Sequence, residues 1–175
     1  MDKAWDVVAA GYGFKCSGCM DNCCTSFFFH HTFIEKAYLL SGLKTLTSGT
    51  QKEILSRAET YCNRTFSTGS EAASLRIMCP VNEEGRCLLY PYRPMICRLH
   101  GIPHEMKKPG GLPVKGPGCR AGGFDEKPYI AFDRTPFYRQ MALLEMDFRK
   151  MRHLSGKIKQ TVAQMLLSRQ SDIQE

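Results

Sequence analysis

The sequence lacks any apolar run long enough to cross a bilayer. The longest candidates, Phe27 to Phe29 and Ala37 to Leu40, fall far short of the roughly 20 residues that a membrane-spanning helix needs. The first ten residues also lack the basic segment and long apolar stretch of an export signal. We therefore expect a soluble, cytoplasmic protein without membrane association, in a compartment that keeps its thiols reduced.

Familiar catalytic and nucleotide-binding motifs are missing as well. There is no Ser-His-Asp order, and Gly11 and Gly13 are too short a motif for a dinucleotide fingerprint. The Pro109-Gly110-Gly111 segment lacks the Lys-Ser/Thr that follows a phosphate-binding loop. There is no internal repeat beyond the two groups of cysteines, and no low-complexity tract.

Cysteine, in contrast, is abundant, with nine in 175 residues. An odd number leaves one thiol over in any monomeric disulfide scheme, and neighbours such as Cys23 and Cys24 rarely bridge each other without strain. With 43% hydrophobic residues, a chain of this length buries a core without covalent staples. These observations favour a metal site over a disulfide framework.

The cysteines fall into an early and a late group. The early group begins with the C-x-x-C spacing most common in metal knuckles, and Ser17-Gly18 lets its backbone curl around one ion. The predicted ligand pool is Cys16, Cys19, Cys23, Cys24, Cys79, Cys87, Cys97 and Cys119. Eight thiolates supply two four-coordinate zinc sites, or one iron–sulfur cluster with thiols in reserve, and spacing does not separate the two. Cys62, within a helical pattern, is expected to be a small buried hydrophobe.

The positive charge of the chain fits such a site. The formal net charge is +7 with every cysteine neutral, and eight thiolates holding two zinc ions would reduce it to roughly +3. Four arginines flank late cysteines and are expected to offset thiolate charge: Arg86, Arg93, Arg98 and Arg120. His100, three residues after Cys97, is a further candidate for a ligand or a hydrogen-bond donor beside the metal.

The periodicity predicts a mainly α fold in a single domain, residues 1–175. A cysteine-bearing region at 10–125 precedes a helical region at 135–169. Capping-box patterns at Thr32 and Thr50 predict a helical hairpin that turns about Ser48-Gly49.

No helical or strand period persists from Cys79 to Lys127, so this middle is expected to be irregular and held by ligation. Thr135-Pro136 is typical of a helix start. One long amphipathic helix, or two in series broken at Gly156, should then run to about Ser168.

The cysteine pattern carries a family resemblance. A C-x-x-C-x-x-x-C-C motif at 16–24 is followed by Cys79-Pro80, Gly85-Arg86-Cys87, Tyr90 and Arg93-Pro94-x-x-Cys97-Arg98. Over residues 10–125 the chain resembles the bacterial YkgJ-like cysteine-cluster family, described as zinc- or iron-chelating. The resemblance implies metal chelation through these cysteines. A similar signature occurs in the longer flagellin lysine-N-methylases, for which an iron–sulfur cluster is implied.

Three functions follow as hypotheses. The first is a metal-binding protein that holds zinc or an iron–sulfur centre for structure, metal handling or redox sensing. The second is an iron–sulfur enzyme acting on a protein or small molecule, although no sequence feature marks its substrate pocket. The third is a zinc-dependent nucleic-acid binder, disfavoured because the charges of the last helix alternate with an apolar face. A metal ion or cluster is the expected partner, a protein partner is compatible with the pattern, and the oligomeric state is not predicted.

Overall fold

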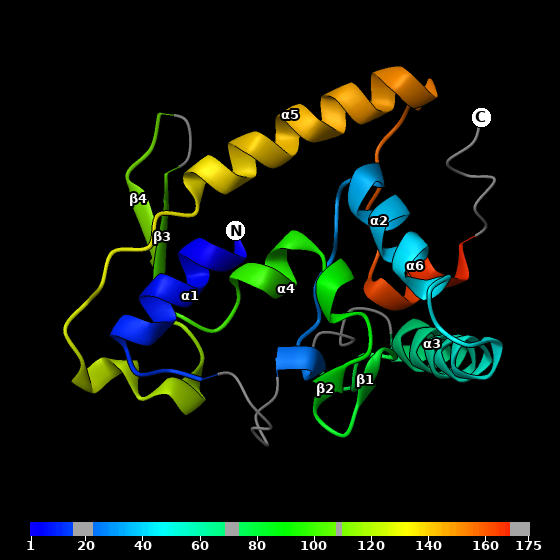
Figure 1. Ribbon diagram of the computed structural model, residues 1–175, viewed down its shortest axis with the longest axis horizontal. Coiled ribbons are helices and arrows are strands. Elements are labelled where there is room, and N and C mark those ends of the chain that lie inside the picture. The colour runs from blue at the N-terminus through cyan, green and yellow to red at the C-terminus, as the bar shows by residue number, and fades with distance from the viewer. Residues whose placement is uncertain (16–22, 69–73, 108–109, 169–175) are drawn as a thin grey trace. The chain divides into compact units, whose positions relative to one another are not determined.

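The computed structural model describes residues 1–15, 23–68, 74–107 and 110–168. Within these residues the chain is mainly helical, with two small two-stranded sheets (Figure 1). It divides into two compact units: residues 1–23 with 95–144, and residues 24–94 with 145–175. We call them unit 1 and unit 2. That they form one domain stays a prediction.

Unit 1 is built around helix α1 (Asp2–Gly11) and the short helix α4 (Met95–Leu99). Its core joins residues from the start of the chain to residues more than eighty positions later: Val8, Ala9, Tyr12, Met95, Leu99, Ile102, Phe124 and Phe132. Helix α1 contributes because Val8 and Ala9 lie together on its buried face, with Tyr12 one turn further on. The Tyr12 ring meets the Phe124 ring edge-on, with centroids 4.9 Å apart.

A hairpin and short helical turns complete unit 1. Strand β3 (His104–Lys107) pairs antiparallel with β4 (Pro113–Gly116), so that His104 faces Gly116. The 3₁₀ turns η4 (Arg120–Gly122) and η5 (Phe124–Glu126) follow. Helix α5 (Thr135–Arg152) then begins in unit 1 and ends in unit 2, with the boundary after Leu144.

Three consecutive backbone carbonyls at and just after the end of α4 accept hydrogen bonds from distant segments. A helix end leaves such groups without intrahelical partners. Here the carbonyls of residues 99, 100 and 101 accept from the Arg134 guanidinium, the Trp5 indole N–H and the Cys119 amide, respectively. The last two bonds measure 2.8 Å each. These bonds fix the chain that leaves α4 against the rest of unit 1.

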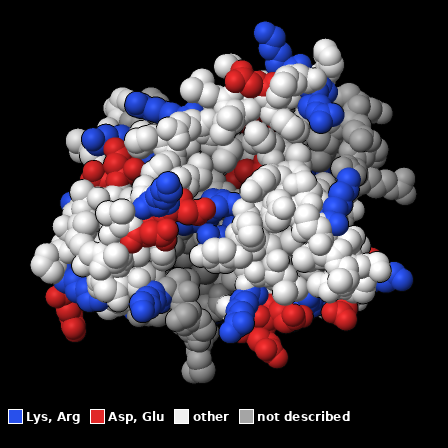
Figure 2. All heavy atoms as spheres, viewed as in Figure 1, with Lys and Arg blue, Asp and Glu red and all other residues white. Residues whose placement is uncertain are grey.

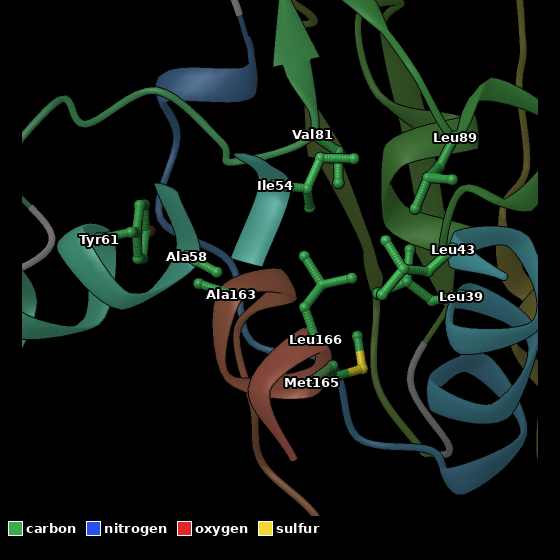
Figure 3. Packing of buried hydrophobic residues seen from close by; sticks show 10 residues of the cluster. All are labelled: Leu39, Leu43, Ile54, Ala58, Tyr61, Val81, Leu89, Ala163, Met165 and Leu166. Atoms are coloured by element: carbon green, nitrogen blue, oxygen red, sulfur yellow. The ribbon is translucent and has the colours of Figure 1, made fainter. Parts of the chain in front are cut away.

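Unit 2 packs helix α6 (Val162–Leu167) against both α2 (Phe33–Leu43) and α3 (Ser48–Thr68). Its core consists of Leu39, Leu43, Ile54, Ala58, Tyr61, Val81, Leu89, Ala163, Met165 and Leu166. Figure 3 shows α6 lying between the α3 residues of this cluster and the α2 residues. Helix α6 is short, and a capping box formed by Thr161 and Gln164 satisfies its first amides.

A buried carboxylate holds the start of α2. The two oxygens of Glu145, on α5, accept from the amides of Phe33 and Ile34 at 3.0 Å each. Arg149, one turn later on α5, donates to Glu145 at 2.6 Å. A negative charge at a helix N-terminus is favourable because it meets the positive end of the helix dipole. Long-range contacts therefore place α2, in addition to its Thr32 cap.

A tight hairpin in unit 2 carries one of the predicted ligands. Strand β1 (Asn82–Glu83) pairs antiparallel with β2 (Arg86–Cys87). The two residues between them have positive φ, 48° at Glu84 and 80° at Gly85, as the turn of a two-residue hairpin requires. The 3₁₀ turn η3 (Tyr90–Tyr92) follows.

The mainly α prediction is confirmed, with corrections to its details. Helix α3 begins at Ser48, and the Thr47 hydroxyl, rather than Thr50, caps it by accepting from the Thr50 amide at 3.3 Å. The two C-terminal helices in series are present, with Gly156 in the break between them: the first ends at Arg152 and the second begins at Val162. Helix α1 and both hairpins were not predicted. In the described ranges, no helix combines the length and apolarity needed to cross a bilayer.

Candidate metal centre

The structure places part of the predicted ligand pool. Cys16 and Cys19 lie outside the described residues, and the backbone of Cys23 begins the 3₁₀ turn η1 (Cys23–Thr25). The other five predicted ligands are partly buried thiols: Cys24, Cys79, Cys87, Cys97 and Cys119. Cys62 is likewise a partly buried thiol.

Unit 2 brings one early predicted ligand, Cys24, near two late ones, Cys79 and Cys87. The Cys79 amide donates to the Cys24 carbonyl at 2.8 Å. The Arg76 guanidinium bonds the Thr25 hydroxyl at 3.1 Å, which is a second link between the same two segments. The Cys24 thiol in turn interacts electrostatically with that of Cys87 on strand β2. One member of the early group thus lies near two members of the late group.

The environment of Cys87 favours the thiol over the thiolate. Burial raises the pKa of Cys87, and the nearby Cys24 thiol adds to the increase. A backbone hydrogen bond from Leu89 and the positive charge of Arg93 lower the pKa, but they do not cancel the effect of burial. A cation beside the sulfur would reverse this balance because metal ligation removes the thiol proton.

Tyr61 interacts with the predicted ligand Cys79 and with Cys62, the ninth cysteine. Burial raises the pKa of Tyr61 to about 12, and the Cys79 and Cys62 thiols contribute to the increase. Both thiols therefore lie near the tyrosine ring. Cys62 packs against the unit 2 core, as expected of a small hydrophobe, and burial raises its pKa. The sequence places Tyr61 and Cys62 in a helix, but it does not show that Tyr61 lies near Cys79.

The remaining two described ligands belong to unit 1. Cys97 is in the middle of α4, and Cys119 precedes the turn η4, with its amide bonded to the Gly101 carbonyl. Cys119 also packs against the unit 1 core. Gly101 lies two residues after the end of α4. Its hydrogen bond therefore ties the Cys119 backbone to the segment that follows the helix of Cys97.

The flanking arginines have different surroundings. Arg93 lies over the Tyr90 ring, 3.4 Å from its centroid, and its charge acts on Cys87 as expected. Arg98 pairs with Asp2 at 2.5 Å, on helix α1. Arg86 and Arg120 are exposed. Arg93 is therefore the arginine whose described surroundings agree with charge compensation.

The described donors do not by themselves complete a site. Among residues 1–15, 23–68, 74–107 and 110–168, no three His, Cys, Asp or Glu side chains are grouped closely enough to hold a metal ion. Cys24, Cys79 and Cys87 are sulfur donors of the type that zinc and iron–sulfur clusters take. A four-coordinate site at this place would need them to approach one another and to gain a fourth ligand.

Among the described residues that Figure 2 shows, both basic and acidic side chains occur at the surface, together with uncharged ones. A phosphate-binding surface would gather basic residues on one face or stripe.

Comparisons of the chain with protein-family models, curated proteins and solved structures found no match.

Proposed function

We propose that this protein binds zinc or an iron–sulfur centre through cysteine thiolates of its early and late groups. The observation that supports the proposal most directly is the hydrogen bond from the Cys79 amide to the Cys24 carbonyl, which joins the early and late groups within unit 2. Helices α2 and α3 lie between Cys24 and Cys79 in the sequence, so the contact between these two segments depends on the fold. The ligand pool we propose is the eight cysteines predicted from the sequence.

The metal would supply the charge that the site lacks. Because burial keeps Cys87 protonated in the absence of a cation, binding should release protons and draw the sulfurs together. The proposal places the protein in the cytoplasm, where thiols remain reduced and available as ligands. Metal binding would then serve structure, metal handling or redox sensing.

Serine substitution in unit 2 tests the proposal. We expect Cys24→Ser and Cys87→Ser to lower the metal content of protein purified without oxygen, because each removes a thiolate ligand. The matched control is Cys62→Ser, a partly buried cysteine outside the pool. Metal is measured by elemental mass spectrometry, and an absorption spectrum separates colourless zinc from coloured iron–sulfur protein. Unchanged metal content in Cys24→Ser and Cys87→Ser would overturn the proposal.

A further inference from the structure

We propose that Arg134, His100 and His104 form an oxyanion-binding site in unit 1, suited to a phosphate or carboxylate group. This inference uses none of the eight cysteines proposed as metal ligands, and it gives His100 a role other than that of a donor beside the metal.

Arg134 is a buried cation with an unused donor. The residue is 5% exposed. One terminal nitrogen of its guanidinium donates to the Leu99 carbonyl at the end of α4, whereas its Nε is buried and, among the described residues, has no hydrogen-bond partner. Capping α4 explains one donor, but it supplies only a partial negative charge. Buried charges are normally paired, because desolvating an ion costs several kcal/mol.

The carboxylate next to Arg134 in the chain, that of Asp133, serves other groups. Asp133 accepts from the Thr135 amide at 2.8 Å and lies 4.0 Å from the Lys107 ammonium. Glu105 meets Arg134 through its backbone, whose carbonyl accepts from the Arg134 amide at 2.9 Å. No carboxylate in the described part of the chain forms an ion pair with Arg134. A negative partner for this guanidinium must therefore come from elsewhere.

Two imidazoles share the surroundings of Arg134. Burial and the positive charge of Arg134, in that order, lower the pKa values of both His100 and His104. The two rings also act on each other, since His104 further lowers the pKa of His100. Both histidine residues are partly exposed to solvent.

A glycine makes room for the His104 ring. A Cβ atom at Gly116, the cross-strand partner of His104, would lie 2.2 Å from the ring's Cε1 atom. The ring therefore lies across the β4 backbone, where any side chain at position 116 would displace it. The His104 Nδ1 is 3.4 Å from the Ile102 carbonyl, which further limits the ring's orientation.

These three groups suit an oxyanion. A guanidinium presents its N–H groups in a planar fork that matches carboxylate and phosphate oxygens. A bound anion also favours the protonated imidazole, which donates from both nitrogens. The same negative charge would compensate the buried Arg134. A bound anion would therefore stabilise both the buried guanidinium and the protonated imidazoles.

The first test is anion binding by the full chain. Inorganic phosphate and acetate are titrated separately at constant pH and at ionic strength matched with sodium chloride, and the midpoint of thermal unfolding is followed. We expect a saturable rise beyond that in chloride, because a ligand that binds only the folded state stabilises it. A rise with phosphate alone identifies a phosphoryl ligand, and a rise with acetate a carboxylate. No saturable rise with either anion would overturn the proposal.

Variants then locate the site. Gly116→Ala should fold, because the His104 ring can swing aside, and should weaken anion binding about tenfold by displacing that ring. Arg134→Met should abolish binding if it folds. The control is Arg139→Met, which removes an exposed arginine of α5 and should leave binding unchanged. Wild-type affinity in Gly116→Ala, or loss of affinity in Arg139→Met, would contradict the assignment.

Discussion

At the scale of single residues, two glycines in unit 2 helices have opposite surroundings. A Cβ atom at Gly42, on α2, would lie 2.3 Å from Cγ of the Tyr92 ring and 2.7 Å from its Cβ. At Gly49, in the first turn of α3, the nearest atom is the Thr47 hydroxyl at 3.9 Å. The first glycine thus allows η3 to pack on α2, whereas the second has no packing role.

Alanine substitution should therefore change stability in opposite directions. Gly42→Ala should lower the free energy of unfolding by about 1–3 kcal/mol. The added methyl group would overlap the Cβ and Cγ atoms of Tyr92, so the whole tyrosine side chain would have to shift. Gly49→Ala should raise it by up to about 1 kcal/mol, the ordinary gain of alanine over glycine in a helix. Urea unfolding of both variants measures the two changes. Stabilisation by Gly42→Ala would show that η3 does not pack on α2 as described.

His30 is the residue whose burial should make stability depend on pH. Its backbone pairs with Gln160, with an N–H···O distance of 2.7 Å, and its side chain is buried. Burial, with a smaller contribution from His31, lowers the pKa of His30 from 6.5 to about 4. The unfolded chain therefore binds a proton more readily than the folded chain between these two values.

Above pH 6.5 the imidazole of His30 is neutral in both states and does not reduce stability. As the pH falls from 6.5 towards 4, protonation of His30 in the unfolded chain lowers the free energy of unfolding. The contribution of His30 amounts to on the order of 3 kcal/mol. Urea unfolding of His30→Gln at several pH values should show a correspondingly shallower loss than the wild type. His153→Asn, at an exposed position, is the control and should keep the wild-type slope. Equal slopes in His30→Gln and wild type would refute the role of His30.

At the scale of elements, the Glu145 carboxylate fixes the start of α2 from α5. Replacing it by alanine leaves the Phe33 and Ile34 amides without these acceptors and Arg149 without its 2.6 Å partner. We expect Glu145→Ala to lower the free energy of unfolding by about 2–3 kcal/mol, because it removes a buried charged acceptor from two amides.

The matched control is Glu53→Ala, which removes an exposed carboxylate from α3 and should change stability by less than about 0.5 kcal/mol. Chemical denaturation monitored by circular dichroism gives both values. A small effect of Glu145→Ala would mean that α2 begins without this contact.

The elements that the sequence predicts are those with a local signal. Helix α2 has an N-cap and acidic first turn at Thr32 and Glu35, and both are present in the structure. The start of α3 was misplaced because Thr47 and Thr50 both fit an N-cap, and only the hydrogen bond to the Thr47 hydroxyl decides between them. Strands of two and four residues are too short to show a period.

Long-range contacts account for the rest of the candidate site. The spacing of the cysteines predicts a ligand pool. The proximity of Cys24, Cys79 and Cys87, however, depends on one backbone hydrogen bond and a hairpin. Tyr61 is likewise affected by Cys79, and Arg134 donates a hydrogen bond to the carbonyl of Leu99; both partners are distant in sequence. Local patterns cannot show which distant groups meet.

At the scale of the whole molecule, we predict that metal binding and folding are coupled. Metal that binds the native chain through thiolates stabilises it, and its removal by a chelator should lower the midpoint of thermal unfolding. Since Cys24, Cys79 and Cys87 also contact the unit 2 core or its connecting segments, the loss should extend beyond the ligands themselves.

The most direct test of thiolate ligation is the native mass spectrum of the chain purified without oxygen. The account predicts a mass above that of the 19.8 kDa polypeptide by one or two zinc ions or one iron–sulfur cluster. That increase should be reduced by the mass of the thiol protons that ligation displaces. A spectrum showing the bare polypeptide with all nine thiols protonated, after purification in the presence of zinc and iron, would contradict the account.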